Sequence, residues 1–263
     1  MTGETATIRN PAKERLKAGE PIIAFNVFEA LRPSVVKIAR QLGVDLLLVE
    51  TEHVQHNPET LTNFLVLARD NGLSPTVTIP TVTRPIVSGL LDAGALGLCL
   101  CHAETLEQVE ALVRWMKYPP VGERALAHAA NAGYRIDDAQ RYCAEANRAT
   151  LLLLKIESRH GIANAEAMLA NEWVDGVVFG PGDLAADMGL HGRGQDPAVL
   201  AAIEGVIALA LKRGIAVEGA VMATDKAEYQ RQRARGLQIF GPARGTEYDH
   251  MRRGAELAIA PFR

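Results

Sequence analysis

The 263-residue chain has few cysteines, no long apolar run and little charge imbalance, and each shortage excludes a class of protein. Its three cysteines are too few for a disulfide framework, which favours a reducing compartment and a cytoplasmic location. The formal net charge of −3 leaves no basic surface for nucleic acid. No apolar run approaches the roughly 20 residues that cross a bilayer, and the start of the sequence has no hydrophobic segment typical of a signal peptide. We therefore expect neither a nucleic-acid partner nor membrane association.

The composition is that of an ordinary globular protein, with 48% hydrophobic and 22% charged residues. A chain of about 250 residues can form one α/β barrel domain. No linker rich in proline, glycine or serine divides the sequence. We expect a single domain over residues 1–263.

Eight short apolar runs are spaced along the chain, and each predicts a β-strand. Their near-continuous apolar character, without strict alternation, is typical of a parallel sheet that is covered on both faces. The expected strands are Pro21–Asn26, Asp45–Glu50, Pro75–Ile79, Leu96–Leu100, Leu151–Glu157, Val174–Phe179, Ile215–Gly219 and Leu237–Phe240.

Amphipathic segments between these runs predict helices, several of which end at a glycine. They are Pro33–Leu42, Pro58–Asp70, Arg84–Ala93, Glu104–Lys117 and Pro197–Arg213. Eight strand–helix units predict a (β/α)8 TIM barrel. A doubly wound sheet is the alternative, but no GxGxxG motif follows the first strand to support it.

Charged residues stand where three of the expected strands end, which is where the active site of such a barrel lies. Lys155 and Glu157 are two positions apart, so they share one face of their strand. Asp183 follows the next strand along the chain. Glu157 and Asp183, with no set of Cys or His ligands, suggest a hard divalent cation such as Mg²⁺ or Mn²⁺. A salt-bridge network at the rim of the barrel is the alternative interpretation.

Three segments resemble the HpcH/HpaI aldolase family of metal-dependent pyruvate aldolases: Asp45–His53 (DLLLVETEH), Lys155–Gly161 (KIESRHG) and Val174–Gly189 (VDGVVFGPGDLAADMG). The resemblance extends to Leu90–Gly94 (LLDAG) and to the GxR element that ends at Arg124. It implies a phosphoenolpyruvate/pyruvate-type barrel, a divalent cation (Mg or Mn first, Co or Zn as alternatives) and a homo-oligomer such as a hexamer. The helical pattern Met251–Ala260 also favours an oligomer.

The resemblance assigns roles to individual residues. Glu157 and Asp183 match the metal-binding carboxylates of the family. His53 matches its catalytic histidine, which transfers a proton, and Asp92 matches an acid that partners this histidine from the same or a neighbouring subunit. Glu50 stands where the second strand of relatives usually ends in aspartate.

One family feature is missing from this sequence. Relatives carry an arginine at the end of the third strand that binds the oxo-acid oxygen, and gap-free counting places Thr78 there. Loss of such a donor typically costs ~10²–10³ in rate. Arg84 and Lys155 are the candidate replacements. We favour Lys155, because its strand fixes its direction whereas Arg84 opens a helix; the alternative is that Lys155 only pairs with a carboxylate.

The end of the fourth strand also departs from the family, with Cys101 and His102 in place of an apolar pair. Cys99 and Cys101 share a face, so a thiol can look into the barrel, although a buried cysteine usually serves as a small hydrophobe. His102, Gly182 in the GPxDL turn and Arg124 complete the predicted substrate-binding set with Thr78 and Arg84.

These observations predict an aldolase-type carbon–carbon lyase that needs a divalent metal ion. Its substrates would be 4-hydroxy-2-oxo acids, which it would cleave into a pyruvate-like enolate and an aldehyde. Related enolate reactions, namely oxaloacetate decarboxylation and acyl-thioester condensation, fit the same residues. Schiff-base chemistry on Lys155 is a further alternative. The last alternative is a non-catalytic protein that binds oxo acids on the same scaffold. Thr78 supports this alternative, because it stands where relatives carry the arginine that binds the oxo-acid oxygen.

Overall fold

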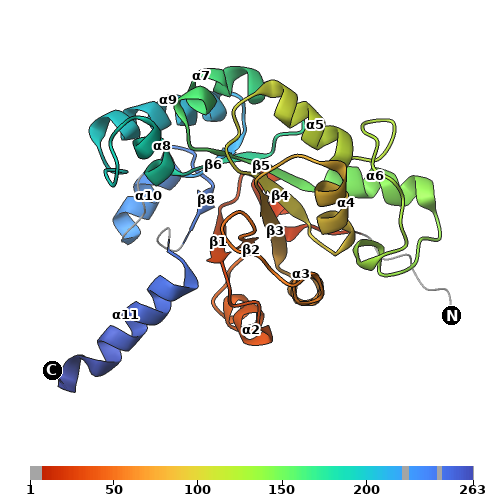
Figure 1. Ribbon diagram of the computed structural model, residues 1–263, viewed down its shortest axis with the longest axis horizontal. Coiled ribbons are helices and arrows are strands. Elements are labelled where there is room, and N and C mark those ends of the chain that lie inside the picture. Colours follow the sequence, from red (N-terminus) through yellow and green to blue (C-terminus); the bar gives the residue numbers. More distant parts are fainter. Residues whose placement is uncertain (1–7, 221–224, 242–244, 263) are drawn as a thin grey trace.

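The computed structural model describes residues 8–220, 225–241 and 245–262, and a ring of eight parallel strands forms its centre (Figure 1). The strands are β1 (Ile22–Val27), β2 (Leu46–Val49), β3 (Ser74–Ile79), β4 (Gly97–Leu100), β5 (Leu151–Ile156), β6 (Gly176–Phe179), β7 (Ala216–Val217) and β8 (Ile239–Phe240). From β1 to β7 each strand pairs with the next in the chain, and β8 pairs with β1. A single bridge between Glu218 and Ile239 joins β7 to β8 and closes the ring. The predicted eight strands and (β/α)8 barrel are confirmed.

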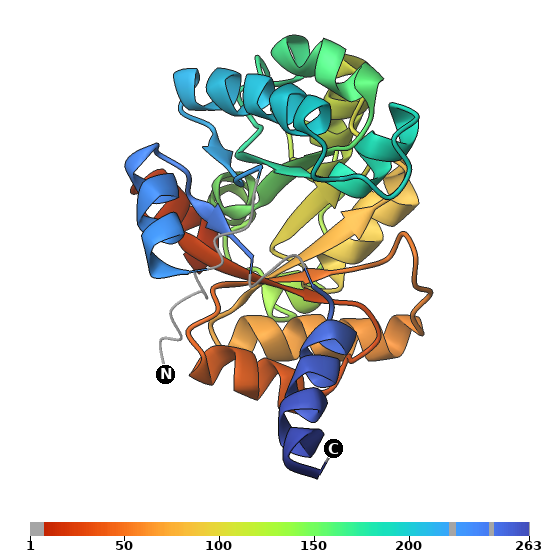
Figure 2. The ribbon, with the colours of Figure 1, turned by 90° about the vertical axis from the view of Figure 1, so that its left-hand side faces the viewer.

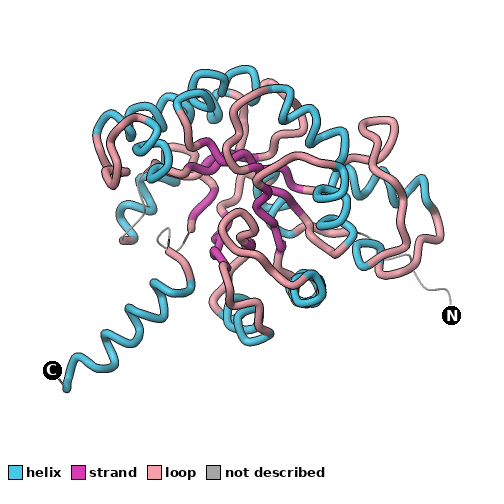
Figure 3. Tube along the Cα trace, in the orientation of Figure 1, coloured by secondary structure: helices cyan, strands magenta, loops and turns pink. Residues whose placement is uncertain are grey.

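Helices surround the strands (Figure 3). They are α1 (Pro11–Lys17), α2 (Pro33–Gln41), α3 (Pro58–Asp70), α4 (Arg84–Asp92), α5 (Leu106–Met116), α6 (Ala139–Ala149), α7 (Arg159–Met168), α8 (Pro181–Asp187), α9 (Pro197–Lys212), α10 (Lys226–Ala234) and α11 (Glu247–Ile259). The five expected helices agree with α2, α3, α4, α5 and α9 because their start and stop signals are local. For example, Asn57 caps α3, and Gly72, at φ +75°, follows its end. Within the described ranges no helix has the length and apolar character to cross a membrane.

The barrel has two apolar cores, one on each face of the sheet. The outer core lies between strands and helices, and the inner core fills the ring with side chains such as Ile22, Leu46 and Leu153. Helix α1 belongs to the inner core, because its Ala12 is fully buried there. A packed interior of this kind leaves space for polar chemistry only where the strands end.

Helix α11 differs from the others because none of its residues is buried. It extends away from the barrel in both ribbon views (Figures 1 and 2). Its first residue, Glu247, accepts hydrogen bonds from the backbone N–H groups of Phe28, Glu29 and Ala30, which fixes the start of the helix to the loop after β1. The apolar side chains farther along are therefore left in solvent.

Candidate active site

Five side chains on the inner face of the barrel gather at the carboxyl ends of β2, β3, β4 and β5. Side chains alternate between the two faces along each strand, and the residues of the inner core mark the inward-facing positions. Continuing this alternation to the strand ends places five more side chains on the inner face: Glu50, Thr78, Cys101, Lys155 and Glu157. The first three and Glu157 are buried, and the side chain of Lys155 is 18% exposed. The barrel therefore presents acid, amine, hydroxyl and thiol groups at the end where catalytic residues of this architecture lie.

Glu157 is the most deeply buried acid of the site, with a side chain that is fully shielded from solvent. Its Oε1 accepts a hydrogen bond of 2.9 Å from the backbone N–H of His102. Its Oε2 is buried and forms an ion pair with the ammonium of Lys155, whose Nζ lies 2.8 Å away. Burial raises the pKa of Glu157, an effect that the charge of Lys155 opposes. At Gly180 any Cβ would collide with this oxygen, so the end of β6 needs a glycine to admit the carboxylate.

Lys155 provides the positive charge beside this carboxylate. Its Nζ lies 2.8 Å from Glu157 Oε2 and 3.7 Å from Glu52 Oε2. Burial, the largest single effect, lowers the pKa of Lys155, but the charge of Glu157, its hydrogen bond to Lys155 and the neighbouring thiols together raise the pKa above its ordinary value. The side chain is therefore an ammonium at neutral pH. An ammonium is not a nucleophile, and this weighs against Schiff-base chemistry.

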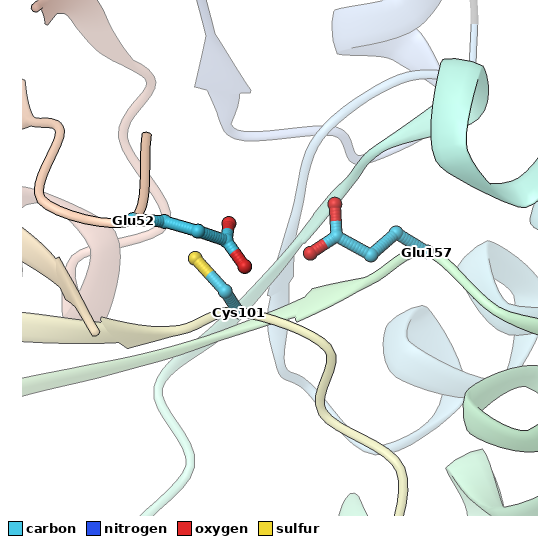
Figure 4. Close-up of side chains that lie close together, drawn as sticks. All are labelled: Glu52, Cys101 and Glu157. Atoms are coloured by element: carbon cyan, nitrogen blue, oxygen red, sulfur yellow. The ribbon is translucent and has the colours of Figure 1, made fainter. Parts of the chain in front are cut away.

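Glu52, Cys101 and Glu157 point toward one another from three different strand ends (Figure 4). One ligand atom of each lies within 4.8 Å of the other two, a geometry that could hold a metal ion. The thiol of Cys101 interacts with Glu52 by a hydrogen bond, and burial raises its pKa. Together with Glu50 and Lys155, these three residues form what we call the mouth cluster.

The charge of the mouth cluster favours a divalent cation. Two carboxylates, Glu52 and Glu157, lie beside one ammonium, that of Lys155. An anionic oxo acid would be repelled by this excess of negative charge unless a cation offset it.

Sequence reasoning did not assign Glu52 or Cys101 as ligands. The alternation of side chains along a strand did indicate that both residues face inward, because Glu52 is two positions after Glu50 and Cys101 two after Cys99. Proximity of the three groups depends on how the strand ends and the loop after β2 meet, and no local pattern reports that.

Glu50 organises the loop that follows β2. Its Oε1 accepts hydrogen bonds from the backbone N–H groups of Glu52 and His53, and its carbonyl oxygen is 2.7 Å from His56 Nε2. The loop places His53 at the rim, with a side chain that is 60% exposed and its Nε2 3.7 Å from Glu52 Oε2. The structure thus brings His53 next to the mouth cluster.

Thr78 faces inward but its hydroxyl is already engaged. Its Oγ1 accepts a 2.9 Å hydrogen bond from the backbone N–H of Thr51, and the hydroxyl of Thr51 donates to the carbonyl of Thr78. Thr78 therefore ties β3 to the loop after β2. Arg84 opens α4, and its guanidinium lies over the ring of Trp115, 5.6 Å from the centroid. Of the two candidate replacements for the family arginine, Lys155 is the one in the mouth cluster.

The residues after β4 and β6 lie on the same rim. His102 has a left-handed backbone (φ +44°) that aims its N–H at Glu157, while its side chain is exposed. Gly182 and Asp183 occupy the first turn of α8, and both are exposed. Asp183 is not one of the three grouped ligands, so its metal role stays a prediction.

Asp92 and Arg124 pair with each other at the opposite end of the barrel. Asp92 ends α4, whose following turn leads back to the amino end of β4. The Asp92 carboxylate accepts a 2.6 Å hydrogen bond from Arg124, which is buried and lies 4.7 Å from the ring centroid of Tyr118. Within the described chain, the structure does not bring Asp92 to His53.

The fold and these side chains define a TIM-barrel enzyme with its polar groups at the carboxyl ends of the strands. A family model described as HpcH/HpaI aldolase/citrate lyase matches residues 27–243. The chain therefore belongs to the HpcH/HpaI aldolase/citrate lyase family. The predicted family is confirmed, and so is the predicted class of enzyme, a carbon–carbon lyase.

Relatives that are named as aldolases support the same assignment. The chain is 34% identical over 256 residues to 4-hydroxy-2-oxo-heptane-1,7-dioate aldolase of Salmonella arizonae, covering 97% of this chain and 95% of the relative. It is 30% identical over 195 residues to hydroxypyruvate/pyruvate aldolase of Roseobacter denitrificans, with coverage of 74% and 75%. The crystal structure of an HpcH/HpaI aldolase from Desulfitobacterium hafniense superposes with a TM-score of 0.87 at 26% identity, over 95% of each chain.

Proposed function

We propose that this protein cleaves 4-hydroxy-2-oxo acids into a pyruvate-like 2-oxo acid and an aldehyde, with a divalent cation bound at the mouth cluster. The observation that carries the proposal is the buried Glu157 carboxylate at the carboxyl end of the barrel, in a cluster where Glu52 and Glu157 face one ammonium. The two relatives that are named as aldolases support the substrate class. Mg²⁺ or Mn²⁺ is the first choice of metal, with Co²⁺ and Zn²⁺ as alternatives.

A bound divalent cation supplies Lewis-acid stabilisation of the enolate, worth several kcal/mol in such sites. We propose that Glu157, in the mouth cluster, and Asp183, in the first turn of α8 outside the cluster, hold it. Lys155 presents its ammonium to the negative charge of the oxo acid, in the role of the arginine that Thr78 replaces. His53 takes the proton from the C4 hydroxyl, a step typically worth ~10²–10⁴ in rate.

The exposed apolar side chains of α11 support a homo-oligomer. On the helix, Met251 is 71% exposed and Leu257 78%, and Phe262, in the short turn after the helix, is 85% exposed. Apolar side chains exposed along one helix favour contact with another chain. We propose that a second copy of this chain covers α11, with a hexamer as one form of the assembly.

The three cysteines are free in the structure, which supports our proposal of a cytoplasmic location.

A substrate panel tests the proposed function. Metal-loaded protein is offered a series of 4-hydroxy-2-oxo acids, and pyruvate release is followed with a coupled dehydrogenase. We expect cleavage, and we expect Glu157→Gln to abolish it while Glu172→Gln, at an exposed position, does not. Oxaloacetate turnover without any aldol cleavage would instead favour decarboxylation. A covalent adduct trapped by borohydride with pyruvate would favour the Schiff-base mechanism.

A further inference from the structure

The Glu157 carboxylate is held by a different group at each of its two oxygens. Its Oε2 forms the ion pair with Lys155, on the same strand. Its Oε1 accepts the 2.9 Å hydrogen bond from the backbone N–H of His102, directly after β4. A lysine side chain is flexible, whereas the direction of a backbone N–H is set by the main chain. The N–H of His102 is therefore the group that can fix the orientation of the carboxylate.

The backbone at His102 has an unusual conformation that gives its N–H this direction. Its φ of +44° lies in the left-handed region, which non-glycine residues rarely adopt. The N–H groups on either side bond to opposite strands, that of Cys101 to a carbonyl of β3 and that of Ala103 to a carbonyl of β5. Between these two bonds, the N–H of His102 points at the carboxylate and not at a strand.

A close approach to α7 holds the same turn from another side. At Gly161 any Cβ would collide with the carbonyl oxygen of Ala103, so this position of α7 needs a glycine. The turn from Cys101 to Ala103 is thus fixed by β3, β5 and α7 together. Left-handed residues persist where their surroundings determine them in this way, and they cluster at active sites.

We propose that His102 is a positioning residue, whose left-handed backbone directs the N–H that orients the Glu157 carboxylate at the mouth of the barrel. The inference rests on the proposed function, in which Glu157 takes part in the chemistry. It assigns the effect to the main chain of His102 and not to its exposed imidazole. A residue that disfavours the left-handed region would misplace the carboxylate, although Glu157 itself is unchanged.

Two substitutions at this position separate the backbone from the side chain. His102→Gly removes the imidazole and keeps the left-handed backbone accessible, whereas His102→Val removes the imidazole and disfavours that backbone. We expect kcat/KM for aldol cleavage to be at least about tenfold lower in His102→Val than in His102→Gly, because a small misplacement of an active-site group is costly. Equal activity of the two variants would overturn the proposal.

Tyr134→Val is the matched control for the backbone change. Tyr134 is the other non-glycine residue with a positive φ (+64°) in the part of the chain that the structure describes, and it lies 69% exposed between α5 and α6. Thermal unfolding should show that both valine variants fold with reduced stability. Only His102→Val should lose activity, and a comparable loss in Tyr134→Val would overturn the proposal in favour of general destabilisation.

The amide signal of His102 tests the hydrogen bond in the native protein without measuring activity. Labelling with ¹⁵N-histidine gives signals for the seven histidines, and the His102→Gly spectrum identifies that of His102 by its loss. We expect this N–H to exchange slowly with solvent, and its proton resonance to shift in Glu157→Gln because the acceptor loses its charge. The amide of His128, exposed in the segment between α5 and α6, should exchange fast and keep its resonance.

The outcomes separate the hydrogen bond from the proposed function. A His102 amide that exchanges as fast as that of His128, or that keeps its resonance in Glu157→Gln, would overturn the positioning role and leave the proposed function standing. Absence of aldol cleavage by the native protein would overturn the proposed function, while a slow-exchanging amide that responds to Glu157→Gln would still support the hydrogen bond.

Discussion

Lys155 has two opposite effects on the chemistry at the barrel mouth, because it lies beside the same carboxylates that would bind a cation. Its ammonium repels a metal ion that approaches Glu157. The same charge attracts the anionic oxo acid. A neutral residue at this position would therefore strengthen metal binding and weaken the attraction of the oxo acid.

Lys155→Met separates these two effects. We expect tighter Mn²⁺ binding, measured by calorimetry, together with a fall in kcat/KM of ~10² or more because the oxo acid loses its cation. Lys226→Met, at an exposed position on α10, serves as the control. Unchanged turnover in Lys155→Met would show that Lys155 does not replace the family arginine.

A role of His53 in proton transfer predicts that its replacement lowers the rate but leaves metal binding intact. We expect His53→Asn to reduce kcat by ~10²–10⁴ at neutral pH, because the C4 proton has no acceptor. Steady-state kinetics measure the loss, and calorimetry with Mn²⁺ checks that the ion still binds. His191→Asn, another exposed histidine, should behave as wild type. A His53 variant that loses metal instead would assign His53 to ligand binding.

At the residue scale, period-two alternation was enough to predict that Lys155 and Glu157 face one side of β5. Position within the strand also indicated that a thiol looks into the barrel. The ligand group itself could not be predicted, because Glu52 and Cys101 meet Glu157 only through the path of a loop. That path depends on backbone hydrogen bonds to the Glu50 carboxylate, which a sequence pattern does not reveal.

Among the elements, the turn from β6 into α8 packs closely against the Glu157 carboxylate. Gly180→Ala introduces a methyl group that collides with Glu157 Oε2. We expect the variant to fold but to lose ~10² in kcat/KM, because a small misplacement of an active-site group is this costly. Circular dichroism and kinetics together measure the outcome.

Gly205→Ala is the matched control, since a Cβ at that position of α9 meets nothing within 4 Å. It should leave the activity unchanged. Full activity in Gly180→Ala would show that the position of the Glu157 carboxylate is not critical.

The elements themselves were largely predictable, because strand and helix signals in this chain are local. Pro58 at the start of α3 and Gly72 after its end define a helix without any tertiary information. Helix α1 is the counterexample. It is short, and its placement at the amino end of the barrel depends on long-range contacts, such as the 2.7 Å ion pair of Lys13 with Asp175.

On the scale of the whole molecule, α11 differs from the other helices because none of its residues is buried in a single chain. We expect the double substitution Met251→Glu, Leu257→Glu to dissociate the native oligomer, because both side chains are exposed and apolar in the monomer. Light scattering after size exclusion measures the mass. Arg252→Glu, also exposed on α11, should leave the mass unchanged.

Assembly also bears on Asp92, which lies at the opposite end of its own barrel from His53. If Asp92 acts on a neighbouring subunit, as the family resemblance implies, the dissociated variant should lose activity while it retains the metal. A native protein that is already monomeric and fully active would contradict the proposed oligomer and the shared role of Asp92 together.

On the proposed function, aldol cleavage requires a divalent cation at the mouth cluster. The most direct test is pyruvate release from a 4-hydroxy-2-oxo acid by protein treated with EDTA, then dialysed, then supplied with one ion at a time. We expect no turnover in the metal-free protein and recovery with a divalent ion in native protein, but not in Glu157→Gln. Full turnover after verified removal of all metal would contradict it.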